Sequence, residues 1–114
     1  MPVTIAFVMD PMAGLNIQSD TSFAFMMAGV AKGARIFHVK PSCLSLKGGE
    51  LYLRGHYIEV QDVKGEHYRE VEEALVAARD CKAIFVRTDP PFDSNYLTAT
   101  WLLSFAERNG VLVI

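Results

Sequence analysis

The chain has 114 residues, a formal net charge of −2, 51% hydrophobic residues and 21% charged residues. This length suits one domain and is too short for a two-domain enzyme. The near-neutral charge gives no basis for binding nucleic acid or an anionic membrane, and no apolar stretch is long enough to span a bilayer. The apolar content is slightly high for a free-standing domain, which indicates that some apolar surface meets further chain.

The N-terminal third predicts a strand, a helix and a second strand. Residues 3–9 form a nearly continuous apolar run, typical of a central parallel strand that is covered on both faces. A helix is expected to start near Asp20, where Ser19 or Asp20 can cap it, and to end at Gly33. Residues 35–39 then form a second strand, so this segment is a βαβ unit whose crossover should be right-handed.

The rest of the chain predicts a hairpin followed by alternating helices and strands. Residues 44–47 and 50–53 alternate in polarity and are joined by Gly48 and Gly49, which tolerate the positive φ angles of a tight hairpin turn. The apolar spacing from Glu66 to Arg79 predicts a helix with acidic residues on its outer face. The remaining predicted elements are a short strand at 57–60, a strand at 83–86, a helix at 94–108 and a strand from 111 to 114. This order predicts an α/β domain with a mainly parallel sheet and an inserted β-hairpin.

A stiff, charged turn follows the predicted strand at 83–86. Pro90 and Pro91 hold the residues before them out of the helical region, so the turn is extended. Asp93 can cap the next helix. A purely structural turn would need neither Arg87 nor Asp89, and ligand crevices in open α/β sheets lie at the carboxyl ends of strands. This turn is therefore a candidate site.

Asp10 ends the first predicted strand, as Arg87 and Asp89 end the later one. If the two strands are neighbours, these groups face one crevice together with the start of the helix near Ser22. A guanidinium, free backbone N–H groups and carboxylates would suit the zwitterion of an amino acid or small peptide. Structural roles are the alternatives, since Asp10 can close a turn and Arg87 can pair with Asp89 or Asp93.

Other residue types in the chain predict no chemistry. There is no glycine-rich dinucleotide-binding or P-loop motif. His38, His56 and His67 are scattered over different predicted elements and are interpreted as surface or core residues. Cys43 and Cys81 lack metal-ligand spacing and are interpreted as free thiols. Trp101, Phe105 and the methionines of the first helix have core-like spacing.

Several of these segments resemble one family. The segment Arg87-x-Asp89-Pro90-Pro91-Phe92-Asp93 is similar to the Arg-Lys-Asp-Pro-Pro-Phe-Asp segment of bacterial glutathione synthetases, although Thr88 departs from the family's lysine. The segments that match the family's opening in order and spacing are Val8-Met9-Asp10-Pro11, Asn16-Ile17 and Asp20-x-Ser22-Phe23-Ala24. Leu97-x-Ala99-Thr100 lies where the family has a similar helix. The resemblance covers the whole chain but only the family's N-terminal domain.

The resemblance implies a fold and a reaction. The implied fold is a Rossmann-like, three-layer pre-ATP-grasp domain over residues 1–114, without the ATP-grasp domains that follow it in the family. The implied reaction is the ATP- and Mg²⁺-dependent joining of γ-glutamylcysteine to glycine through an acyl phosphate. In that reaction the domain would form one wall of the substrate cleft and contribute to homo-oligomer contacts. Arg87, Asp89, Asp10 and Ser22 would then bind substrate, while no catalytic residue, cofactor site or metal site is expected in this chain.

Further expectations follow from the ends of the chain. A chain that stops inside a predicted buried strand is expected to be part of a longer protein, inactive as a ligase alone. The first residues carry no basic region or cleavage signature, which predicts a cytoplasmic protein.

Two other classes of protein remain open. Asp10 at the end of the first strand superficially resembles a phospho-acceptor receiver domain, but the paired acidic residue and the late lysine of such domains are absent. The chain could also be a stand-alone module for binding a small ligand or for oligomerisation. Replacing Arg87 with alanine separates these roles, because a structural role predicts lost folding and a binding role predicts weakened affinity.

Overall fold

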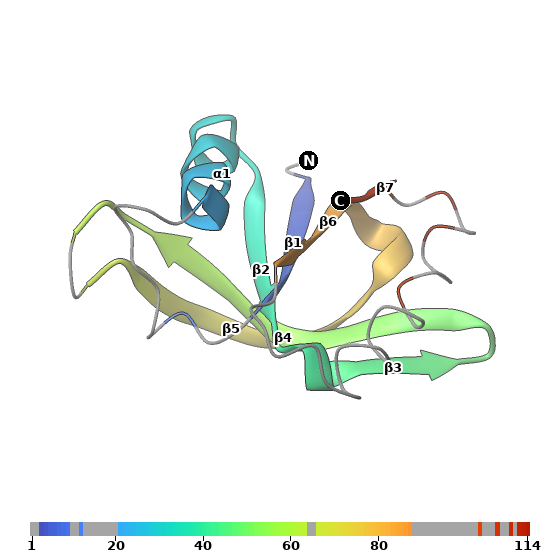
Figure 1. Cartoon of the computed structure of the whole chain (residues 1–114). Coiled ribbons are helices and arrows are strands. Elements are labelled where there is room, and N and C mark those ends of the chain that lie inside the picture. The colour runs from blue at the N-terminus through green and yellow to red at the C-terminus, as the bar shows by residue number, and fades with distance from the viewer. Residues whose placement is uncertain are drawn as a thin grey trace.

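A computed structural model describes residues 3–9, 12, 21–63, 66–87, 103, 107, 110 and 112–114. Within these residues the chain forms a seven-stranded sheet with the α-helix α1 (Figure 1). The strands and the helix are, in chain order, β1 Thr4–Met9, α1 Thr21–Ala31, β2 Arg35–Val39, β3 Leu44–Lys47, β4 Glu50–Val60, β5 Tyr68–Ala77, β6 Cys81–Arg87 and β7 Leu112–Val113. Two short 3-10 helices, Pro41–Cys43 and Ala78–Asp80, precede β3 and β6. The protein is thus a mixed α/β domain.

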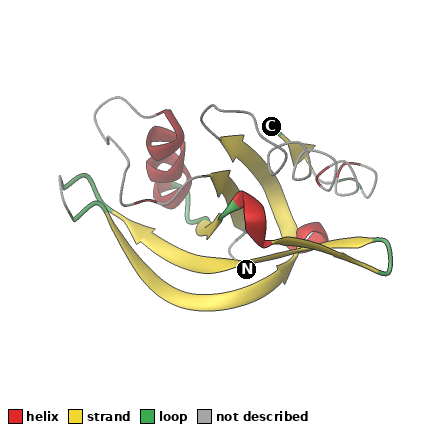
Figure 2. Cartoon of the chain, turned by 60° about the horizontal axis from the view of Figure 1, so that its bottom comes forward, coloured by secondary structure: helices red, strands yellow, loops and turns green. Residues whose placement is uncertain are grey.

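The sheet has a parallel part and an antiparallel part. Its strand order is β3-β4-β2-β1-β6-β7, and β5 pairs with β4. The β1–β2, β1–β6 and β6–β7 pairs are parallel, while the β2–β4, β3–β4 and β4–β5 pairs are antiparallel. Figure 2 shows that β4 and β5 are long and strongly curved, so that the sheet curls. The prediction of a mainly parallel sheet is therefore wrong, because half of the strand pairings are antiparallel.

Apolar side chains pack on both faces of the central strands. On the face of α1, Phe7 and Ile36 pack with Phe23 and Met26 of the helix. The other face has a separate cluster, whose largest fully buried members are Phe37, Leu51, Leu53, Ile84, Val8 and Val39. Complete burial of such side chains stabilises the fold by roughly 1.5–3 kcal/mol each. The prediction that the first strand is covered on both faces is confirmed.

Glycines end α1 and turn the hairpin as predicted. Gly33 has a φ of +84°, its N–H donates to the Val30 carbonyl, and the Ala34 N–H donates to the Gly29 carbonyl. These two bonds form a Schellman motif, in which a left-handed residue ends the helix. Gly48 and Gly49 have φ angles of +60° and +81° and join β3 to β4. Two successive positive φ angles match a type I′ turn, which suits the twist of paired strands.

The predicted helix from Glu66 to Arg79 is wrong, because most of this segment is β5. This strand pairs with β4 from Tyr52↔Ala77 to Val60↔Tyr68. The ladder has a register shift between Tyr57 and Ile58, opposite which β5 carries one extra residue, Val71. The two predicted strands at 50–53 and 57–60 are one continuous strand, β4, and this strand provides the edge that captures β5.

The predicted strand at 83–86 is confirmed as β6, and the predictions beyond it are tested only at single points. β7 pairs in parallel with β6 through Ala83↔Leu112, which confirms a strand after residue 111. Leu103 and Glu107 are helical, and Leu103 is buried. Three other predicted features lie outside the described residues: the rest of the helix at 94–108, the proline turn, and the proposed caps at Ser19 and Asp20.

Candidate functional site

The carboxyl ends of β1 and β6 are adjacent. The two strands pair in parallel, with Met9 opposite Arg87 at the last position of the ladder (Figure 1). The condition on which the predicted crevice depended, that these strands are neighbours, is therefore confirmed. Asp10 directly follows β1, and Asp89 follows β6 two residues after Arg87. Both aspartates and the predicted cap Asp93 lie outside the described residues, and Arg87 is described only through its backbone, so their convergence stays a prediction.

Ser22 lies in the first turn of α1. Its relative exposure is 5%, and the next residue, Phe23, is also buried. Because the helix packs on the face of the sheet that carries Phe7 and Met9, its first turn is held near the carboxyl end of β1. The structure thus places Ser22 on the expected side of the sheet and leaves little of its surface open to a ligand.

Sequence reasoning missed the role of His67, a buried residue just before β5. Its Nε2 atom lies 2.6 Å from the backbone oxygen of Met12, and its relative exposure is 6%. A carbonyl oxygen can only accept, so Nε2 must carry the proton and donate it. The ring also meets Phe23 edge-on, with the centroids 6.0 Å apart. His67 therefore joins the β4–β5 connection to the segment after β1 and to the start of α1, and no sequence motif indicates this contact.

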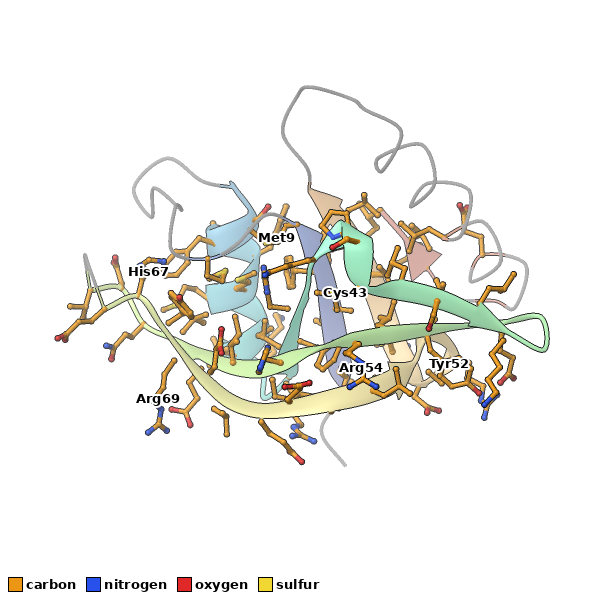
Figure 3. The ribbon with its side chains drawn as sticks, turned by 90° about the horizontal axis from the view of Figure 1, so that it is seen from below. Met9, Cys43, Tyr52, Arg54, His67 and Arg69 are labelled. Atoms are coloured by element: carbon orange, nitrogen blue, oxygen red, sulfur yellow. The ribbon has the colours of Figure 1, made fainter. Side chains whose placement is uncertain are left out.

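A second polar region lies on β4 and β5 next to the end of β2, which is itself paired beside the end of β1. A cavity of about 280 Å³ opens there, and its polar lining residues are His38, Lys40, Arg54, His56, Glu70 and Glu73. Met12, Ile58 and Tyr68 supply apolar surface, and Cys43 and Gly55 complete the wall. Figure 3 shows Arg54 and Cys43 on this part of the molecule. Among the described residues, no group of three or more histidine, cysteine or acidic side chains has the arrangement of a metal site.

The two cysteines differ in their surroundings. Cys81 is buried at the start of β6, whereas Cys43 is partly buried at the wall of the cavity. Burial, and secondarily the neighbouring Asp80 carboxylate, raise the pKa of the Cys81 thiol from 9.0 to about 11. Both thiols are free, as predicted. Because the thiolate is the reactive form, Cys81 should be inert near neutral pH.

The described part of the chain is thus an α/β domain in which β1 and β6 end side by side and a polar cavity lies on β4 and β5. Residues 3–114 match the family described as the N-terminal domain of prokaryotic glutathione synthetase, and the chain belongs to this family. Glutathione synthetase of Agrobacterium fabrum is 38% identical over 99 residues, which are 87% of this chain and 31% of the relative.

Two further relatives agree. Glutathione synthetase of Brucella melitensis is 39% identical over 103 residues, 90% of this chain and 33% of the relative. That of Vibrio cholerae is 35% identical over 112 residues, 98% of this chain and 35% of the relative. The chain therefore spans about a third of the length of these curated relatives. In the part of the chain that the structure describes, no helix is long and apolar enough to cross a membrane.

Proposed function

We propose that this chain supplies the N-terminal, substrate-side domain of an ATP-dependent ligase that joins γ-glutamylcysteine and glycine to form glutathione. The match to the family's N-terminal domain over residues 3–114 carries this proposal. The relatives, each named glutathione synthetase, align with the chain over about a third of their length, which fits a role as one domain of a larger enzyme. Residues 1–114 would form the pre-ATP-grasp domain, with the three-layer, Rossmann-like arrangement of that class.

In this proposal the chain positions substrate and does not carry out the chemical step. The ends of β1 and β6 lie side by side, so Asp10, Arg87 and Asp89 follow strands that share one edge of the sheet. A guanidinium at this edge would bind a substrate carboxylate, and a carboxylate would bind a substrate ammonium group. Ser22, at the start of α1, would contact the same ligand. Such groups contribute to catalysis by holding the reactants in a productive orientation.

The remaining functions would lie elsewhere in the protein. ATP and Mg²⁺ would be held by ATP-grasp domains, where they supply the phosphoryl group and neutralise its charge. The protein would act in the cytoplasm as a homo-oligomer.

The test compares two proteins in one assay. The complete product of the gene and the 114-residue chain are purified separately and incubated with ATP, Mg²⁺, γ-glutamylcysteine and glycine. We expect ATP-dependent glutathione formation with the complete product and none with the chain alone. Glutathione formation by the isolated chain, or none by the complete product, would refute the proposal. A stand-alone binding module predicts the second of these outcomes.

A further inference from the structure

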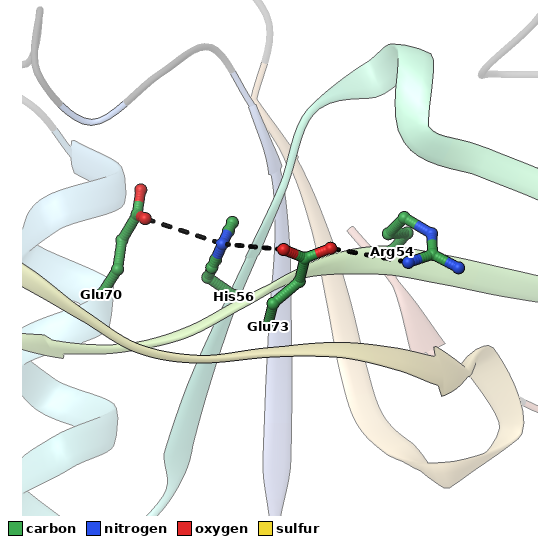
Figure 4. Close-up of polar contacts among 4 residues, drawn as sticks. All are labelled: Arg54, His56, Glu70 and Glu73. Atoms are coloured by element: carbon green, nitrogen blue, oxygen red, sulfur yellow. Dashed lines mark hydrogen bonds and ion pairs between the residues drawn. The ribbon is translucent and has the colours of Figure 1, made fainter.

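Two histidines near the β4–β5 pair have opposite surroundings. His56 stands between two carboxylates, with its Nε2 atom 3.6 Å from Glu70 Oε2 and 3.7 Å from Glu73 Oε2, and its side chain is 35% exposed (Figure 4). Contacts of this length between exposed groups contribute little stability. His67 is buried, and its Nε2 atom donates to the Met12 carbonyl over 2.6 Å. A short, buried hydrogen bond fixes both partners, so His67 holds Met12 in place.

The backbone of His67 is itself held by the connection between β4 and β5. The Gln61 N–H donates to the His67 carbonyl with an N–O distance of 2.9 Å, and the Gln61 side-chain amide donates to the Glu66 carbonyl over 2.6 Å. The Glu66 N–H in turn donates to the Val63 carbonyl. Figure 3 shows His67 at the end of the β4–β5 pair, on the side that faces α1. The imidazole therefore projects from a hydrogen-bonded connection and has a fixed origin.

Met12, which accepts this hydrogen bond, lies close in sequence to the proposed substrate edge. Met9 ends β1 opposite Arg87, and only Asp10 and Pro11 separate it from Met12. Met12 is 3% exposed and packs in the core cluster on the face of α1, so its carbonyl depends on a donor inside the protein. Consecutive Cα atoms keep a spacing of about 3.8 Å and the proline ring fixes φ. A shift at Met12 is therefore transmitted to Asp10.

The same imidazole contacts the start of α1. Phe23 meets the His67 ring edge-on, with the centroids 6.0 Å apart, and Phe23 directly follows Ser22. Edge-to-face contacts between aromatic rings are directional. One side chain thus contacts a point near each end of the segment that runs from Asp10 to Ser22. Groups that bind a substrate have to be held within about 0.5 Å of their productive position, and these two contacts restrict the segment in this way.

We propose that His67 is a positioning residue for the substrate, which holds the segment between β1 and α1 so that Asp10 and Ser22 meet γ-glutamylcysteine. This inference rests on the proposed function and adds to it a residue that touches no substrate. The hydrogen bond to Met12 carries the effect, because the imidazole N–H gives a buried carbonyl its donor at a fixed point. An apolar side chain at position 67 leaves that carbonyl without this donor. The carbonyl then turns toward water, and the backbone at Asp10 moves with it.

Steady-state kinetics of the complete protein test this role. His67→Leu should raise KM for γ-glutamylcysteine roughly tenfold, since misplaced groups lose affinity for the ligand that they touch, while KM for ATP and for glycine should stay within about twofold. His67→Gln keeps an N–H donor near the position of Nε2 and should restore most of the lost affinity. A purely structural role would instead lower the fraction of active enzyme, and with it the apparent kcat, without a selective change in one KM.

Leu51→Ala is the matched control for lost stability. Leu51 is 2% exposed and belongs to the apolar cluster on the other face of the sheet. Removing a buried leucine side chain leaves a cavity, so this variant should lower the midpoint of urea unfolding at least as much as His67→Leu does. It should nevertheless leave KM for γ-glutamylcysteine unchanged. An equal rise of this KM in both variants would overturn the inference, because the rise would then be a general result of lower stability.

Hydrogen–deuterium exchange read by mass spectrometry tests the same contact without turnover. In peptides that cover residues 10–22, His67→Leu should speed amide exchange about tenfold over the unchanged protein, and Leu51→Ala should show no such selective increase. Unchanged exchange in these peptides would overturn the inference, as would an unchanged KM for γ-glutamylcysteine in His67→Leu when the unchanged protein is active. If the unchanged protein makes no glutathione, the proposed function fails instead, and exchange still decides whether His67 holds this segment.

Discussion

Gly55 of β4 lies against the backbone of β2, and replacing it with alanine should be strongly destabilising. A Cβ atom at this position would lie 2.0 Å from the backbone oxygen of His38, 3.0 Å from its carbonyl carbon and 3.1 Å from Cγ2 of Val39. The first two of these atoms belong to backbone in the middle of the sheet. They cannot rotate away as the end of a side chain could, so β4 would have to move away from β2.

The cost can be worked out from these contacts. Inserting an atom into a packed interior costs about 1–3 kcal/mol, and each strand hydrogen bond lost through the separation costs about 0.5–1.5 kcal/mol. Replacing glycine also restricts the unfolded chain, which returns about 0.4–1 kcal/mol. We expect Gly55→Ala to lower the free energy of unfolding by about 2–4 kcal/mol. Domains of this kind are stable by only about 5–15 kcal/mol in total.

Gly29→Ala provides the matched control, and equilibrium unfolding in urea followed by circular dichroism measures both variants. A Cβ atom at Gly29 would meet the side-chain ends of Ile36 at 3.3 Å and Ile5 at 3.6 Å, which can adjust. Alanine is favoured over glycine inside a helix by about 1 kcal/mol, so this variant should be neutral or slightly stabilised. If Gly55→Ala changes the free energy of unfolding by no more than Gly29→Ala does, the reasoning from the β2–β4 contact is refuted.

Three further predictions concern single side chains. His67→Leu should lower the free energy of unfolding by about 1–3 kcal/mol, whereas His67→Gln, which retains an N–H donor, should lose less; equal losses in urea unfolding would contradict the buried hydrogen bond. N-ethylmaleimide at pH 8 should modify Cys43 and spare Cys81, and rapid modification of folded Cys81 would refute the raised pKa of its thiol. The free energy of unfolding should also fall as the pH rises from 9.0 to about 11, because the Cys81 thiol ionises at a lower pH in the unfolded chain than in the folded one. In the complete protein, Arg87→Ala should raise KM for γ-glutamylcysteine roughly 10- to 100-fold, while Arg79→Ala, a surface control that pairs with Glu50, should not; similar values for both would remove Arg87 from the substrate site.

The central part of the sheet could be predicted because its signals are local. Continuous apolar runs identified β1 and β6 as strands. Their pairing was only a condition of the sequence argument, and the structure supplies it with Met9 opposite Arg87. Gly33 and the Gly48-Gly49 pair identified turns by a property of glycine alone. Such features depend on a few neighbouring residues and not on which strand pairs with which.

β5 could not be predicted in this way because its signal is distorted by the extra residue in the strand. In a regular strand, residues two apart share a face. Tyr68, Val71 and Leu75 recur at three- and four-residue spacing. The strand accommodates this spacing because the register shift leaves Val71 as an extra residue opposite β4. That spacing is typical of a helix, and only the pairing with β4 reveals a strand.

The charged cavity was missed for the same reason. Glu70 and Glu73 are three residues apart and would lie on opposite faces of a regular strand. The register shift pairs Glu70 with Ile58 and Glu73 with His56, so both carboxylates flank one histidine. The predicted edge site depended on motifs, whereas this cavity depends on long-range pairing that no motif in the sequence records.

The position of β5 also has a consequence for self-association. Among the described strands β5 pairs only with β4, which leaves its other edge with unpaired backbone groups, a template on which a second chain could add a strand. β5 contains the run Arg69-Glu70-Val71-Glu72-Glu73. Like charges brought together by edge-to-edge pairing would repel, so the glutamates of β5, of which Glu70 and Glu73 also line the cavity, should oppose such pairing.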